Sequence, residues 1–218
     1  MTLSAGGARP RGRPEKRDVM NTKSEQAKIR AAIKEKYADI SRSAAGKFAY
    51  TTGNEGARIL GYETSLLSMI PVEIMGSFCG VGNPFLAGPI NEGETVLDIG
   101  CGSGIDLIVA SQYVGKAGLS CGIDITMEMK NLAKQNAAKV GLSNVQVREG
   151  GVEAIPYGDE TFDVVISNGV LNLSPEKEVA FTEIFRVLAR GGRVQFADIV
   201  LEGERPRDSP GNLEAWSD

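Results

Sequence analysis

The residues with the clearest capacity for chemistry are a glycine-rich stretch, Gly-Cys-Gly-Ser-Gly at residues 100–104, and an acid, Asp124, that lies 20 residues beyond it. The stretch joins a short apolar run, predicted to be a strand, to a predicted helix over residues 105–114. Glycines there let the backbone turn sharply and approach a ligand closely, because no Cβ is in the way. A carboxylate at this spacing, at the end of the next strand, can accept hydrogen bonds from ribose hydroxyls. Together these features predict a site for an adenosine-containing cofactor; the alternative for Asp124 is a turn residue that caps the following helix.

The spacing of the glycines and the acid before them distinguish two kinds of cofactor. A dinucleotide site usually has the pattern G-x-G-x-x-G and rests a pyrophosphate on the helix N-terminus. This chain has G-x-G-x-G, and Asp98 stands two residues before the first glycine. A carboxylate in that loop would repel a diphosphate but could hold a cationic amino group. We therefore predict S-adenosylmethionine, which has a sulfonium and an ammonium group and no phosphate, with a nicotinamide or flavin cofactor as the alternative.

Beyond this loop, the chain resembles the class I S-adenosylmethionine-dependent methyltransferases. The resemblance is carried by residues 98–104, 150–156, 162–168 and 185–193. Within that superfamily it is similar to the arsenite methyltransferase group, on residues 80–84, 122–129, 153–156 and 165–175. The resemblance implies an α/β fold, a Rossmann-like doubly wound parallel sheet of strand order 3-2-1-4-5, and a methyltransferase that uses S-adenosylmethionine.

The chain departs from the arsenite methyltransferases at two positions. Those enzymes bind trivalent arsenic through several cysteine thiolates, but Val81 and Gly169 stand here where the group has cysteines. Only Cys79 lies nearby, and one thiol cannot make a three-sulfur site for a thiophilic ion. The acceptor implied is a small molecule other than arsenite.

The resemblance also implies roles for individual residues. Those expected to bind the cofactor are Asp98, Gly100, Cys101, Gly102, Ser103, Gly104, Asp124, Ile125, Val152 and Asn168. Asn168 would also place a polar group at the reaction centre, and Cys79 is the candidate reactive thiol. Tyr37 is a candidate aromatic side chain of a lid over the pocket. For several residues a purely structural role stays open: core packing for Cys101, Cys121 and Tyr37, and helix capping for Asn172 and Ser174. No metal site is expected.

The chain contains no histidine, which excludes a Ser-His-Asp triad and histidine-ligated zinc. Methyl transfer does not require an imidazole, because a sulfonium is an activated leaving group and an aligned soft nucleophile needs positioning more than proton transfer. An amine or hydroxyl acceptor would need a base drawn from Asp, Glu, Tyr, Lys or Cys.

Charge and composition predict a cytoplasmic protein that acts on a small molecule. The sequence has no apolar run of membrane-spanning length, no signal-peptide pattern and three cysteines without paired spacing. Residues 1–17 carry five basic side chains and one acidic one, a net charge of +4, so the rest of the chain carries −8. That acidic body disfavours a nucleic-acid substrate.

The predicted organisation has three parts: a disordered basic tail (1–20), an N-terminal helical cap segment (21–90) and a methyltransferase domain (91–218). Helices are predicted over 22–40, 63–70, 105–114, 127–140 and 175–188, the last closed by Gly191-Gly192, with a loop over 41–56. Strands are predicted over 96–99, 119–125, 145–148, 163–167 and 193–199.

Few residues follow the fifth predicted strand, so the last two strands of the usual seven are expected to be absent. An unpaired edge strand promotes association. Three interpretations stay open: the chain is a fragment, the edge pairs with a second copy to form a homodimer, or the N-terminal segment covers it. The alternative function is a truncated or degenerate relative that binds the cofactor without catalysis.

Overall fold

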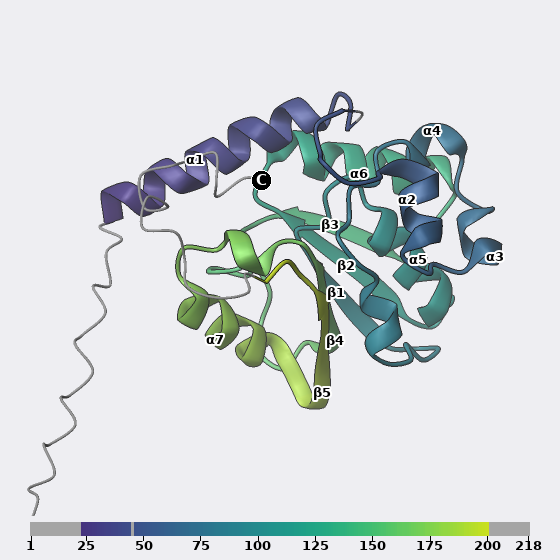
Figure 1. Cartoon of the computed structure of the whole chain (residues 1–218). Helices are drawn as coiled ribbons and strands as arrows, with labels where there is room; N and C mark the ends of the chain where they lie inside the picture. The colour runs from purple at the N-terminus through teal and green to yellow at the C-terminus, as the bar shows by residue number, and fades with distance from the viewer. Residues whose placement is uncertain (1–22, 45, 201–218) are drawn as a thin grey trace, which may run out of the picture.

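The computed structural model describes residues 23–44 and 46–200, and its centre is a five-stranded parallel sheet in the order β3-β2-β1-β4-β5 (Figure 1). Its strands are β1 (Thr95–Ile99), β2 (Leu119–Asp124), β3 (Val145–Glu149), β4 (Phe162–Asn168) and β5 (Leu188–Ala197). The predicted α/β fold and strand order are confirmed. The expectations for residues 1–20 and for the chain beyond Val200 lie outside the described residues.

Helices cover both faces of the sheet, which explains why its central strands are apolar throughout. The helices that follow the first, second and fourth strands are α5 (Ile105–Val114), α6 (Met127–Lys139) and α7 (Lys177–Val187). Val96 and Ile166 pack with α5, whereas Leu97 and Ile123 pack with α7 on the opposite face. Alternate residues of β1 therefore face different helices, and the sheet is buried on both sides.

The carboxyl ends of β1, β2 and β4 lie next to one another at one edge of the sheet. Leu97 of β1 is in register with Cys121 of β2 and with Val165 of β4. Ligands of doubly wound sheets bind at this edge, where the chain crosses to opposite sides of the first strand. The glycine loop, Asp124 and Asn168 are brought together there.

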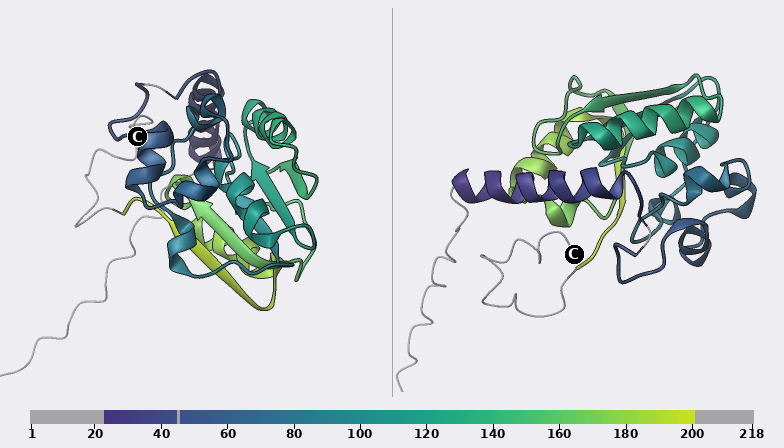
Figure 2. Two further views of the ribbon diagram at one scale, coloured as in Figure 1. Left: turned by 90° about the vertical axis from the view of Figure 1, so that its right-hand side faces the viewer. Right: turned by 90° about the horizontal axis from the view of Figure 1, so that it is seen from above.

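The N-terminal segment folds over that edge. It contains α1 (Lys23–Ile40), α2 (Gly53–Ile59), α3 (Thr64–Leu67), α4 (Val72–Met75) and the short 3-10 helix η1 (Pro84–Ala87). The long helix α1 runs across the top of the molecule, while α2 to α4 gather beside α5 (Figures 1 and 2). Tyr62, Leu67 and Ile74 of this segment form one apolar cluster with Ile105 and Ile108.

Several predicted boundaries were wrong. The predicted helix 175–188 is not closed by Gly191-Gly192: α7 ends at Val187, and Leu188 already pairs with Phe162 of β4. The fifth strand therefore begins at Leu188 and not at the predicted residue 193, and the predicted helix 63–70 is the shorter α3. Both glycines lie inside β5, where the register with β4 shifts, so strand pairing overrides the glycine signal. The predicted loop 41–56 also contains the start of α2.

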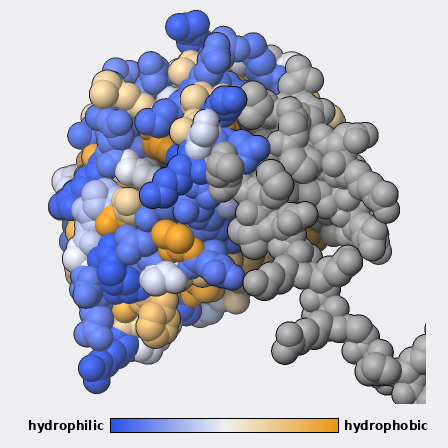
Figure 3. Space-filling model, turned by 90° about the vertical axis from the view of Figure 1, so that its left-hand side faces the viewer, coloured by the Kyte–Doolittle hydropathy of each residue, from blue (hydrophilic) through white to orange (hydrophobic). Residues whose placement is uncertain are grey.

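β5 is an outermost strand of the sheet in the part of the chain that the structure describes. β5 pairs only with β4 among the described residues, and Phe196 is 46% exposed. On the face in Figure 3, the hydrophobic areas in view are small and separated by hydrophilic ones. No helix in the described part of the chain is both long and apolar enough to span a bilayer.

Candidate functional site

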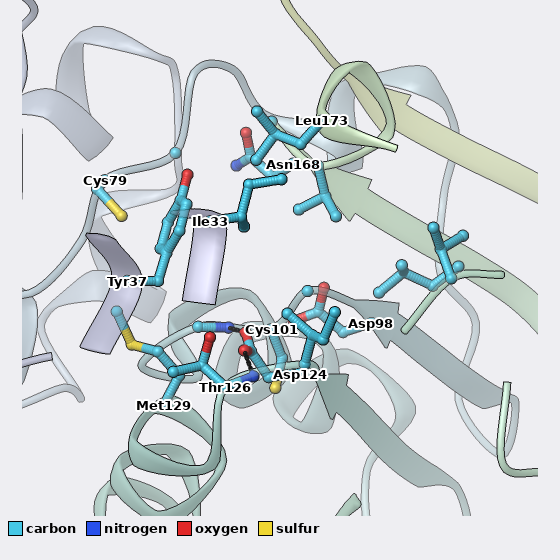
Figure 4. A pocket seen from close by; sticks show the side chains of 18 of the residues that line it. Ile33, Tyr37, Cys79, Asp98, Cys101, Asp124, Thr126, Met129, Asn168 and Leu173 are labelled. Atoms are coloured by element: carbon cyan, nitrogen blue, oxygen red, sulfur yellow. Dashed lines mark hydrogen bonds between the residues drawn. The ribbon is translucent and has the colours of Figure 1, made fainter. Parts of the chain in front are cut away.

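A pocket lies at the carboxyl ends of the strands, and Ile33 and Tyr37 of α1 line it (Figure 4). Asp98, Cys101 and Asp124 lie at one end, while Tyr37 and Leu173 lie toward the other. Of the predicted site residues, those that line it are Cys79, Asp98, Gly100, Cys101, Gly102, Ser103, Asp124, Ile125, Val152 and Asn168. The exception is Gly104, which caps the start of α5 outside the pocket lining.

The glycine loop is shaped by backbone conformation and by close contacts. Gly100 has φ +67°, and a Cβ on it would lie 2.4 Å from a methyl carbon of Val170. Gly104 has φ +88°, and a Cβ there would lie 3.1 Å from that of Ala133. L-residues rarely adopt such angles, so glycine is required at both positions by conformation and by space.

Asp98 is a buried carboxyl with an unused oxygen. It is 2% exposed, and its Oδ2 has no hydrogen-bond partner. Burial raises the pKa of Asp98 well above its usual value, and the neighbouring carboxylates Asp106 and Asp124 raise it further. A buried polar atom without a partner is costly, and a cationic ligand group would relieve that cost here.

Two other pocket residues have buried oxygens without partners: the hydroxyl of Thr126 and the amide oxygen of Asn172. Thr126 precedes α6 beside Asp124, and Asn172 lies in the 3-10 helix η2 (Leu171–Leu173) after β4. The pocket therefore offers hydrogen-bonding atoms at both ends, as expected of a site that takes a polar ligand.

Asp124 hydrogen-bonds to two parts of the backbone. Its Oδ1 accepts from the N–H of Thr126 at 2.8 Å, and its Oδ2 accepts from the N–H of Gly102 at 2.9 Å. The carboxylate thus ties the glycine loop to the turn before α6. Burial raises the pKa of Asp124, and these backbone bonds lower it. Each oxygen keeps a lone pair for a ribose hydroxyl, so the capping and ribose-binding interpretations are compatible.

The side-chain amide of Asn168 is engaged within the protein. Its Oδ1 accepts from the N–H of Val81 at 2.9 Å and of Gly82 at 3.1 Å, and its Nδ2 donates to the Gly82 carbonyl at 2.9 Å. The sequence predicts that this amide is a polar group at the reaction centre. In the structure it binds the backbone of residues 81–82. A catalytic role for Asn168 stays a prediction.

Cys79 does not have the environment of a reactive thiol. Burial raises its pKa to about 12, and the carboxylates of Asp106 and Asp124 act in the same direction. A nucleophilic or metal-binding cysteine needs the thiolate form, so this side chain is a neutral thiol near pH 7. Cys101 and Cys121 are buried, as their core-packing alternative expects.

Val81 and Gly169 face one another in the pocket wall. A Cβ on Gly169 would lie 3.2 Å from both methyl carbons of Val81. The fold therefore places side by side the two positions at which this chain departs from the arsenite methyltransferase pattern. The surface they form is apolar.

Two functional candidates were missed at the sequence level. Asp106 is 8% exposed and accepts hydrogen bonds from Tyr62 and Asn168. An acid inside the apolar run of α5 is a signal that could have identified it. Arg30 of α1 hydrogen-bonds to Glu176 and lies 3.5 Å from Glu153, and no local sequence pattern marks it.

Comparisons with known proteins agree with this geometry. A family model described as a methyltransferase domain matches residues 90–218. The arsenite methyltransferase of Halobacterium salinarum is 35% identical over 206 residues, which cover 88% of this chain and 52% of that protein. A ubiquinone/menaquinone biosynthesis C-methyltransferase of Salmonella arizonae is 36% identical over 123 residues, 56% of this chain and 47% of that protein. The chain spans about half the length of the arsenite methyltransferases it matches.

Solved structures give the same result. An arsenic(III) S-adenosylmethionine methyltransferase from Chlamydomonas reinhardtii superposes with a TM-score of 0.56 at 39% identity, over 62% of this chain and 47% of that one. An S-adenosylmethionine-dependent methyltransferase from Aquifex aeolicus gives 0.51 at 29% identity, over 60% of this chain and 72% of that one. The chain thus belongs to the class I S-adenosylmethionine-dependent methyltransferases, in the group that includes the arsenite and ubiquinone/menaquinone methyltransferases.

Proposed function

We propose that this chain binds S-adenosylmethionine and transfers its methyl group to a small, uncharged and largely apolar acceptor other than arsenite. The observation that carries the proposal is the division of one pocket into an acidic end, with the unpartnered Asp98 oxygen, and an apolar end with Val81 beside Gly169. In this proposal residues 21–90 form the cap and residues 91–218 the methyltransferase domain.

The acidic end fits the cofactor that the family implies. Asp98 would hold the ammonium group, and Asp124 would accept from the ribose hydroxyls. The backbone of the glycine loop would lie along the methionine half, with Ile125 and Val152 beside the adenine ring. When bound, the cofactor supplies a methyl group on a sulfonium, which needs no further activation as a leaving group.

Charge in the pocket favours that cationic ligand over an anionic one. Asp98, Asp106 and Asp124 are all at least nine-tenths buried. Arg30, which also lines the pocket, is paired with Glu176. A ligand with net positive charge gains electrostatic energy here, whereas phosphates of a nucleic acid would be repelled. This supports a small-molecule acceptor.

The apolar end defines the acceptor. The hydroxyls of Tyr37 and Tyr50, among its aromatic side chains, are neutral near pH 7, and burial raises the pKa of each further above its ordinary value. Cys79 is likewise a neutral thiol, so no thiolate cluster is available for trivalent arsenic. The free amide oxygen of Asn172 could accept one hydrogen bond from a donor on the acceptor molecule. The acceptor inferred is an apolar body with a hydroxyl or amine donor.

The first experiment is calorimetric titration of the chain with S-adenosylhomocysteine. We expect micromolar binding, and a loss of about tenfold or more in Asp98→Asn, because a charged hydrogen bond contributes about 1.5–3 kcal/mol. Glu178→Gln is the matched control, since Glu178 is exposed on α7 away from the pocket. A folded chain that does not bind would contradict the proposal.

Acceptor screening then separates catalysis from binding alone. The chain is incubated with methyl-labelled S-adenosylmethionine and a panel of uncharged aromatic alcohols and amines, with arsenite plus a thiol reductant as a separate arm. Label transfer to a panel member supports the proposal. Binding without any transfer favours the alternative, a cofactor-binding relative that does not catalyse, and transfer to arsenite would contradict the acceptor class.

A further inference from the structure

We infer that Asp106 is a positioning residue that acts through Asn168 to fix residues 79–83, the acceptor-side wall of the pocket. This inference rests on the proposed function, because residues 79–83 lie on the acceptor side only if the pocket binds a methyl acceptor. Asp106 lies in the first turn of α5, and its two oxygens accept from the Tyr62 hydroxyl at 2.6 Å and from the Asn168 amide at 2.9 Å. One buried carboxylate therefore joins the cap segment to the end of β4.

Asn168 connects Asp106 to residues 81–82 of the wall through hydrogen bonds. While its Nδ2 lies within hydrogen-bond distance of three acceptors, Asp106, the Gly82 carbonyl and the Tyr62 hydroxyl, its Oδ1 accepts from the N–H groups of Val81 and Gly82. Both hydrogens and both lone pairs of the amide are thus in use. Rotation of the amide would break every one of these bonds, so the contact with Asp106 sets the orientation that holds the wall.

The wall can come this close because it has no side chain at the point of contact. A Cβ on Gly80 would lie 2.3 Å from Asn168 Nδ2, and one on Gly82 would lie 2.5 Å from the Cβ of Ala197. The segment has no helix or strand pairing between the end of α4 and η1. Its position therefore depends on the side chains that reach it.

Tyr62 supports the same segment from the cap. Its ring meets Phe78 and Phe85 edge to face, at centroid distances of 5.3 and 5.9 Å, on either side of residues 79–83. Its hydroxyl also lies 3.3 Å from the Gly82 carbonyl. The ring thus anchors both ends of the segment, while the hydroxyl and Asp106 hold its middle.

The ionised form of Asp106 is the one that accepts both bonds. Burial raises the pKa of Asp106 to about 6, and the bonds from Tyr62 and Asn168 lower it. At neutral pH the carboxylate is therefore charged and accepts from both neighbours. Asp98, Asp124, Tyr62 and Cys79 are the other titratable groups that line or border this part of the pocket.

The test is amide hydrogen exchange of the nitrogen-15-labelled chain without cofactor. In Asp106→Leu, a side chain of similar shape removes the acceptors of both the Tyr62 and the Asn168 hydrogen bonds. We expect exchange at Val81 and Gly82 to accelerate about tenfold, since a lost hydrogen bond to a charged group costs about 1.5 kcal/mol or more. Tyr62→Phe keeps the Asp106–Asn168 contact and should accelerate the same two amides by about threefold.

Asp106→Asn provides the rescue. Its amide oxygen can accept from Asn168 while its NH2 group donates to the Tyr62 hydroxyl, which can donate in turn to the Gly82 carbonyl. Exchange at Val81 and Gly82 that is slower than in Asp106→Leu supports the inference. Unchanged exchange in Asp106→Leu, acceleration throughout the chain, or exchange in Asp106→Asn as fast as in Asp106→Leu would each overturn it. Because no cofactor is present, a failure of S-adenosylhomocysteine binding would count against the proposed function alone.

Discussion

Gly169 lies against Val81: a Cβ on the glycine would be 3.2 Å from both methyl carbons of the valine. Residues 88 positions apart in the sequence thus share one patch of the pocket wall. The resemblance to the arsenite methyltransferases implies a cysteine at each of these positions, and the fold places the two positions next to each other. A surface made of valine and a bare backbone accepts apolar groups rather than a thiophilic ion.

The first prediction concerns this pair. The natural chain should not retain a trivalent arsenical, whereas the double variant Val81→Cys with Gly169→Cys places two thiols side by side and should bind phenylarsine oxide. Mass spectrometry under native conditions measures the adduct, with Val81→Ser and Gly169→Ser as the matched control. Because Gly169 has φ +71°, the cysteine there should cost roughly 1–2 kcal/mol of folding stability. Adduct formation by the natural chain through Cys79 would contradict the prediction.

The second prediction concerns the glycine loop. Gly100→Ala combines a positive φ with a Cβ 2.4 Å from Val170, so it should lower the free energy of unfolding by about 2–5 kcal/mol. Gly141→Ala is the control, because its φ is +73° but nothing lies within 4 Å of its Cβ; it should cost roughly 1–2 kcal/mol. Urea unfolding followed by circular dichroism measures both, and equal losses would show that the contact with Val170 is unimportant.

The third prediction is a dependence of cofactor binding on pH. Burial, with Asp106 and Asp124, raises the pKa of Asp98 in the folded chain, so without a ligand this group favours folding at low pH and loses that contribution as pH rises through the raised pKa. The ammonium group of the ligand needs the ionised carboxylate. Affinity for S-adenosylhomocysteine should therefore rise with pH above the ordinary aspartate range, and binding should release a proton.

Calorimetry in two buffers of different ionisation enthalpy measures that proton release. Asp98→Asn should abolish the part of the release that comes from this group. Proton uptake on binding, or an affinity that falls as pH rises, would show that Asp98 does not hold the ammonium group in its ionised form.

The fourth prediction concerns α1. Arg30 of α1 pairs with Glu176 and Glu153, and its side chain is 29% exposed. Arg30→Gln should speed dissociation of S-adenosylhomocysteine by a few-fold while changing the free energy of unfolding by less than about 1 kcal/mol, because partly exposed ion pairs contribute little to stability. Stopped-flow displacement measures the rate, and Lys34→Gln, on the exposed side of the same helix, is the control. Equal rates in both variants would show that the ion pairs of Arg30 do not slow dissociation of the ligand.

Much of the fold followed from short-range patterns in the sequence. The helix over 105–114 was predicted with the bounds of α5, and α1, α6 and β2 were within one residue of their observed ends. These elements begin and end at local signals such as the glycine loop. The prediction failed at Gly191-Gly192, because pairing of Leu188 with Phe162 extends β5 toward the helix. Strand pairing depends on a partner that local sequence does not contain.

The sequence, with its resemblance to the class I methyltransferases, predicted the sheet, its strand order and most of the residues that meet at its carboxyl edge. Right-handed crossovers leave few other arrangements for parallel strands joined by helices. Only the tertiary structure decided what those residues do to one another. The Asn168 amide reaches Asp106 across 62 residues, Val81 across 87 and Tyr62 across 106. Hydrogen bonds of about 3 Å tolerate little displacement, so such partners are chosen by the packing of the whole chain and not by the residues beside them in sequence.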